Sequence, residues 1–86
     1  MPEITRFYGI IIKMFLPSSK NYDCSPNFFA LYDENIENFD INTLDINYGD
    51  LPPRAVSIVK EWAALHQSEL LEMWNTQNIH KLQPLR

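Results

Sequence analysis

His66 and Glu69 stand one helical turn apart and have the residue types and spacing that proton transfer requires. A histidine changes its charge near neutral pH, and a carboxylate three residues along a helix lies close enough to orient its ring. Arg6 carries a permanent charge that can stabilise a developing anion. The candidate catalytic residues are therefore His66, Arg6 and Glu69. A structural role stays open for His66, as a hydrogen-bonded residue at the core edge, and for Arg6, in an ion pair.

A long segment between Lys20 and Arg54 contains acids but no lysine or arginine. Carboxylates concentrated in this way attract a basic protein partner, and they oppose binding to the phosphates of nucleic acids. We predict an acidic binding surface made of Asp33, Glu34, Glu37, Asp40 and Asp45. The alternative is that these acids only solvate strands and turns and prevent aggregation between sheet edges.

Metal-binding residues are sparse, since the chain has one cysteine, Cys24, and two distant histidines, His66 and His80. No pair of them has the spacing of a zinc site. The segment 40–45 lacks the glycine and the terminal glutamate of a calcium loop. We therefore expect no metal and no cofactor, and we expect Cys24 to be an ordinary loop residue.

The sequence pattern predicts strands followed by a helix, and these elements must position the candidate residues. Together they indicate an α+β fold with a four-strand antiparallel sheet over about residues 4–48. The expected strands are 4–15, 27–32, 36–41 and 44–48. The first is apolar on both faces, which is typical of an inner strand, and Gly9 within it indicates a bulge or a close backbone approach. The residues 33–35 form a turn. Asn42 and Thr43 predict a hairpin turn, or alternatively a longer loop that includes Asp45.

One long C-terminal helix is predicted over about residues 52–76. Asp50 can cap its first turn, where proline is tolerated because its missing N–H has no partner there. One wide face of the helix gathers Ala55, Val59, Trp62, Ala63, His66, Leu70 and Met73. Such a face indicates a helix packed across one face of the sheet. The tail 79–86 is expected to run extended along the domain.

The length and charge set the class of protein. A chain of 86 residues with a net charge of −4 has room for one hydrophobic core, so we expect a single domain over 1–86. Its lone cysteine favours a reducing compartment. The apolar run that ends at Lys13 is too short for a signal sequence or a membrane span, and the expected location is the cytoplasm.

Three stretches resemble a bacterial family described as the domain of unknown function number 4160. They are the segments 1–14, 49–55 and 61–74, and the resemblance extends over the whole chain. In this family the second strand usually begins with Pro-His-Phe-His-Ala. The same segment here, 26–30, reads Pro-Asn-Phe-Phe-Ala, with Asn27 and Phe29 in place of the two histidines. Any chemistry of that pair is therefore expected to be absent or altered.

The resemblance implies small cytoplasmic proteins that are often encoded beside another short protein, as in toxin–antitoxin modules. The first functional hypothesis is accordingly a protein-interaction module, which binds a small partner encoded by the adjacent gene through charge complementarity and strand addition. The alternative is a small ribonuclease-like or hydrolytic toxin in which His66 transfers a proton, with Arg6 or Glu69 assisting.

Overall fold

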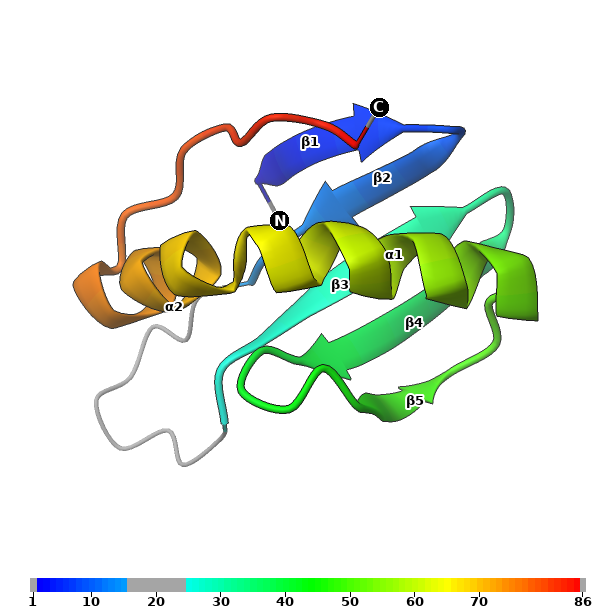
Figure 1. Ribbon diagram of the computed structural model, residues 1–86, viewed down its shortest axis with the longest axis horizontal. Helices are drawn as coiled ribbons and strands as arrows, with labels where there is room; N and C mark the ends of the chain where they lie inside the picture. Colours follow the sequence, from blue (N-terminus) through cyan, green and yellow to red (C-terminus); the bar gives the residue numbers. More distant parts are fainter. Residues whose placement is uncertain (1, 16–24, 86) are drawn as a thin grey trace.

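The computed structural model describes residues 2–15 and 25–85, which form an α+β fold of one antiparallel sheet and two helices. The strands are β1 (Glu3–Phe7), β2 (Ile10–Lys13), β3 (Asn27–Tyr32), β4 (Asn35–Asp40) and β5 (Ile46–Gly49). The helices are α1 (Pro53–Leu65) and α2 (Gln67–Thr76). The strand order β1-β2-β3-β4-β5 follows the sequence, and both helices cover the same face of the sheet (Figure 1). None of the helices in this part of the chain is long and apolar enough to cross a membrane.

The prediction of one inner strand over 4–15 was wrong, because the segment folds back on itself as the β1–β2 hairpin. Its two-residue turn consists of Tyr8 and Gly9, with φ angles of 50° and 78°. A two-residue hairpin turn of type I′ requires positive φ at both central positions, which asparagine and glycine adopt easily and tyrosine adopts at a cost of about 1–2 kcal/mol. Since Tyr8 is a poor turn residue, the sequence indicates a bulge or a close backbone approach at Gly9 rather than a turn. The sheet therefore has five strands rather than four.

The hairpin changes where the first two cations lie. Arg6 is paired with Ile11, and Glu3 is paired with Lys13. Residues that are directly opposite on antiparallel strands project from the same face, and so do residues two apart on one strand. Arg6 and Lys13 consequently share the outer face of the sheet, which the helices do not cover, whereas one continuous strand would have placed them on opposite faces.

The other two hairpins fall close to their predicted positions. A two-residue turn at Asp33 and Glu34 connects β3 to β4, and all six residues of β3 have partners in β4. The β4–β5 connection is the longer of the two loops that the sequence allowed, since β5 begins only after Asp45. Within this loop the Asp40 Oδ1 accepts a hydrogen bond from the Thr43 N–H at 3.0 Å. That bond closes the loop after β4 ends.

The predicted single helix is broken at His66, where the backbone leaves helical geometry (φ −118°, ψ 18°). Its N–H is shared between the carbonyls of Trp62 and Ala63. The next residue, Gln67, donates from Nε2 to the carbonyls of Ile41 (2.7 Å) and Asn42 (2.8 Å). Gln67 thus anchors the helices to the β4–β5 loop at the break. No proline or glycine at this position indicates the break in the sequence.

Asp50 does not cap the helix. Pro52 occupies the N-cap position of α1 with no side-chain hydrogen bond to the first turn. The Asp50 Oδ1 instead accepts a hydrogen bond from the Ile36 N–H at 3.2 Å, and the Asp50 N–H donates to the Ile36 carbonyl at the same distance. The residue therefore closes the end of the β4–β5 pair.

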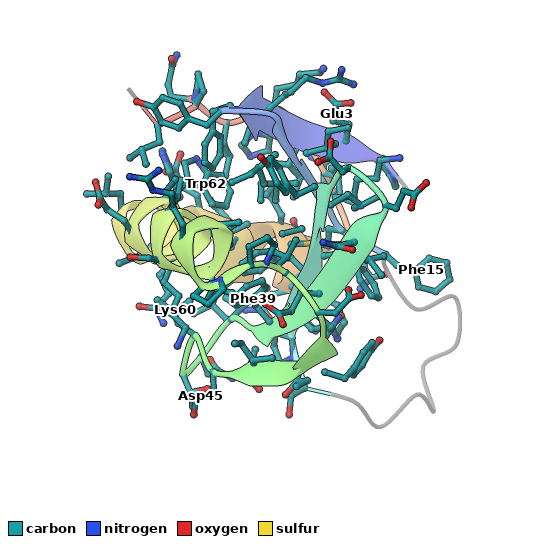
Figure 2. The ribbon with its side chains drawn as sticks, turned by 90° about the vertical axis from the view of Figure 1, so that its right-hand side faces the viewer. Glu3, Phe15, Phe39, Asp45, Lys60 and Trp62 are labelled. Carbon is teal, nitrogen blue, oxygen red and sulfur yellow. The ribbon has the colours of Figure 1, made fainter. Side chains whose placement is uncertain are left out.

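The core lies between the helices and the inner face of the sheet. Trp62 is fully buried and lies with Phe39 between these two layers, while Phe15 projects on the far side of the sheet (Figure 2). The rings of Phe28 and Phe39 stack with centroids 5.2 Å apart, and Phe28 meets the edge of Trp62. The apolar residues of the predicted helix face are all buried, namely Ala55, Val59, Trp62, Ala63, Leu70 and Met73.

The C-terminal segment after α2 returns across the molecule to β1 (Figure 1). Its Leu82 side chain is buried, and the Leu82 N–H donates to the Ile4 carbonyl of β1 at 3.1 Å. The indole Nε1–H of Trp62 donates to the Gln83 carbonyl at 2.8 Å. This tail contact occupies the β1 edge of the sheet with a buried side chain and a backbone hydrogen bond to Ile4.

Candidate functional site

His66 and Glu69 are in contact at the helix break, with 2.6 Å between Nδ1 and Oε1. An ionised carboxylate only accepts, so Nδ1 carries the proton and the Nε2 of a neutral ring is an acceptor. The ring lies against Trp62 with centroids 5.1 Å apart, and 16% of the His66 side chain is exposed. An oriented imidazole of this kind has the form of a general base. The same contact also fastens the first turn of α2 to the residue that precedes it.

Arg6 is not part of that arrangement. Its Nη2 lies 2.8 Å from the Glu3 Oε1 on the outer face of the sheet, and 62% of its side chain is exposed. The hydrogen bond between them is the main reason that the pKa of Glu3 is lowered and that of Arg6 is raised. His66 belongs to the helical layer, which covers the opposite face. The structure therefore brings together two of the three candidate catalytic residues and places the third beyond the sheet.

Four of the five predicted acidic residues are distributed between two ends of the sheet. Asp33 and Glu34 form the exposed β3–β4 turn, while Asp40 and Asp45 flank the β4–β5 loop at the opposite end. Asp50 lies at the first end, where it is bonded to Ile36. The acids thus do not form one patch, but two groups that lie at the two ends of β5.

Glu37 is an interior residue, with 4% exposure. It lies opposite Gly49, where an added Cβ would come within 2.4 Å of the Glu37 Cα, so only glycine fits there. Burial is the largest cause that raises its pKa, and Asp50 raises it further, while the Leu51 N–H and Lys60 act in the other direction. The Glu37 Oε2 has no hydrogen-bond partner. This carboxyl group thus takes up a proton more readily than an exposed one does, and its burial separates it from the acids on the surface.

The strand between the two acidic ends, β5, is exposed along its whole length. Tyr48 is 60% exposed and Ile46 is 42% exposed. As the last strand of the sheet, β5 pairs only with β4, which leaves one row of its backbone groups open to another strand. Asp45 precedes it and Asp50 follows it, and both are exposed. We define the β5 surface as Asp45, Ile46, Asn47, Tyr48 and Asp50.

A chain of asparagine side chains connects β5 to the middle of the sheet on its outer face. The Asn47 Nδ2 donates to the Asn38 Oδ1 (2.7 Å), and the Asn38 Nδ2 donates to the Asn27 Oδ1 (3.0 Å). The rings of Phe29 and Tyr48 lie beside this chain, with centroids 6.4 Å apart. Asn38, in the middle, is only 3% exposed although no helix covers it. We call Asn27, Asn38 and Asn47 the amide chain.

Sequence reasoning missed the amide chain, although it singled out Asn27, which belongs to the chain, and Phe29, which lies beside it. Asn27 and Phe29 are the positions at which the resembling family has its histidines, and both project from this outer face. The three asparagines lie on β3, β4 and β5, so only the strand register brings them together. With neutral amides and aromatic rings in place of imidazoles, the arrangement orients β5 but supplies no group that transfers protons near neutral pH.

Comparison with protein families gives a match over most of the chain. The family model described as Domain of unknown function (DUF4160) matches residues 9–75, a range that includes β2 to β5, α1 and nearly all of α2. No curated protein and no solved structure matches the chain. Within residues 2–15 and 25–85, no three His, Cys, Asp or Glu side chains gather in a way that could hold a metal ion.

Proposed function

We propose that this chain, which belongs to the family Domain of unknown function (DUF4160), is a protein-interaction module that binds a small basic protein as an added strand on β5. The observation that carries the proposal is an edge strand that is exposed along its length and flanked at both ends by carboxylates. Backbone hydrogen bonds would supply affinity, and side chains at alternate positions would supply specificity.

Charge complementarity defines the partner. No basic residue lies within β5 or its flanks, since the segment 33–50 contains only acids among its charged residues. In a symmetric antiparallel pair of two β5 strands, Asp45 of one copy would lie opposite Asp50 of the other. Like charges at such positions oppose association. A strand that carries lysine or arginine beyond both of its ends is therefore favoured over a second copy of this chain.

The side chains of β5 define the pattern of the added strand. Tyr48 projects from the outer face beside Phe29, and Ile46 lies opposite Phe39 on the side of the core. A partner strand would thus meet an apolar side chain on each face of the sheet. An added strand that is apolar on both faces and basic at its ends satisfies both conditions.

The gene arrangement that the family resemblance implies provides a source for such a partner. A short protein encoded by the adjacent gene, in a toxin–antitoxin-like pair, is the partner that we propose. In a pair of this kind each protein is made in the presence of the other, so an exposed edge would be covered soon after folding.

The contact between His66 and Glu69 supports a second candidate, a small ribonuclease-like or hydrolytic toxin. Induced expression would then arrest growth, and His66→Ala would abolish the arrest without loss of folded protein. Growth arrest that persists in His66→Ala would remove this residue from any catalytic mechanism.

Binding variants on β5 test the interaction module directly. The chain and the adjacent gene's product are mixed, and the dissociation constant is measured by calorimetry at two salt concentrations. We expect Asp45→Lys to weaken binding by roughly tenfold and to reduce its salt dependence. Tyr48→Ser should weaken it by a similar factor. Glu61→Lys makes the same charge change on the exposed surface of α1 and serves as the control, with unchanged affinity. Equal affinity for all four proteins would contradict the proposal.

A further inference from the structure

A hollow separate from β5 lies on the helical side of the sheet, between the β1–β2 turn and the first turns of α1. The β1–β2 turn, the β3–β4 turn and the start of α1 are at the same end of the molecule (Figure 1). The hollow has a volume of about 490 Å³, within the range of roughly 300–1,000 Å³ that is usual for small-molecule sites. Its apolar walls include Ile10, Ala55 and Ile58. The space is therefore large enough for a small organic molecule.

Two tyrosine rings form part of the lining. Tyr32 packs against the backbone of Gly9, where an added Cβ would come within 3.3 Å of the Tyr32 ring. Tyr8 is held at a φ of 50°, in a conformation that asparagine or glycine would adopt with less strain, and it is 58% exposed. Burial of its own ring thus does not explain a tyrosine at this turn position. An exposed ring beside an apolar hollow provides a surface for an aromatic ligand.

Arg54 supplies the charge of this site. It is exposed on the first turn of α1, and none of the residues that line the hollow is acidic. Within the described residues, no carboxylate forms an ion pair with its guanidinium. A free guanidinium presents a planar set of donors that binds a carboxylate in a bidentate manner. One cation with apolar walls and two rings suits a ligand with a single negative charge and a flat apolar body.

We propose that this hollow binds a planar aromatic carboxylate, with its carboxylate on Arg54 and its ring system between Tyr8 and Tyr32 over the apolar walls. The site shares no residue with the β5 surface, so it is independent of the protein-interaction proposal. Its occupation would add a small-molecule binding activity to the chain.

Titration of the isotope-labelled full chain with 2-naphthoate, followed by NMR, tests this site. We expect saturable shifts that centre on the backbone amides of Ile10, Tyr32 and Ala55. Arg54→Gln should weaken binding by roughly tenfold or more, because a charge-assisted pair is lost. The uncharged analogue 2-naphthamide should bind the wild-type chain more weakly by a similar factor.

Two further variants separate the site from general effects. Tyr8→Asn removes the ring but suits the positive φ of the turn, so it should weaken 2-naphthoate binding severalfold while the chain stays folded. Lys81→Gln removes an exposed cation outside the hollow and should bind as the wild type does. No saturable binding, shifts centred elsewhere, or equal affinity of the wild type and Arg54→Gln would each overturn the proposal.

Discussion

The two edges of the sheet differ in whether another part of the chain covers them. At the β1 edge the C-terminal segment buries Leu82 and donates a hydrogen bond to Ile4. At the β5 edge all four residues are exposed. The charges differ too, since Arg6 and Lys13 project from β1 and β2, while Asp45 and Asp50 flank β5. Two open edges on one sheet could join copies head to tail without closure. The tail covers the β1 edge, whereas none of the described residues covers β5.

The largest expected effect comes from uncovering the β1 edge. Leu82→Ala removes the buried anchor of the tail and should lower the free energy of unfolding by about 2–3 kcal/mol. Concentration-dependent association should appear in size-exclusion chromatography, because the β1 edge becomes available to β5 of another copy. Leu65→Ala, at a leucine that is 68% exposed, is the matched control and should change stability by less than about 0.5 kcal/mol. Equal loss in both variants would show that the tail anchors nothing.

Breaking the amide chain should loosen the other edge. Asn38→Ala leaves Asn27 and Asn47 without their shared partner and should cost about 2 kcal/mol in urea unfolding. Hydrogen exchange should become faster in β5 and stay unchanged in β1, because the amide chain reaches only the β5 side of the sheet. A variant with equally accelerated exchange at both edges would refute this asymmetry.

A smaller effect, of opposite sign, is expected at Glu37. The folded-state pKa of this buried carboxyl group is raised above its ordinary value of 4.5, so the neutral form is favoured in the folded protein. Its contribution to stability is fully present below the unfolded pKa and is lost as the pH rises through the folded pKa. Glu37→Gln removes this loss and should stabilise the protein at neutral pH by about 1 kcal/mol. Chemical unfolding at pH 7 and at pH 4 checks the sign, because the gain should disappear at the lower pH.

The smallest effect belongs to the exposed pair of Arg6 and Glu3. Here the pKa of Glu3 is lowered, so its stabilising contribution is present above the unfolded pKa and is lost as the pH falls through the folded pKa. Because most of the Arg6 side chain is in water, Arg6→Gln should leave the thermal midpoint at neutral pH unchanged within error. A clear drop in that midpoint would mean that the outer face depends on this pair.

Much of the fold could be predicted from local patterns. The alternation in residues 27–32 and the apolar face of the helical segment depend on burial against one layer, and both follow from periodicity. The β1–β2 turn could not be predicted, because Tyr8 adopts positive φ against its own preference. The helix break at His66 could not be predicted either, because no proline or glycine marks it. It coincides with tertiary hydrogen bonds from Gln67 to the β4–β5 loop.

The candidate site was less predictable than the fold. The composition shows that the segment around β5 is acidic. The strand register, however, decides that the acidic residues lie at two ends of the sheet and that Glu37 is buried. The contact of His66 with Glu69 follows from helical spacing, whereas the separation of Arg6 from both follows from the unforeseen hairpin. Residues far apart in sequence come together only through pairing, as Asn27, Asn38 and Asn47 do.

Hydrogen exchange on the complex with the adjacent gene's product tests the central claim most directly. The backbone amides of β5 should become protected on binding, while those of β1 and α2 keep the exchange rates of the free chain. Protection centred on β1 or α2, with β5 unchanged, would contradict strand addition at this edge and the function that we derive from it.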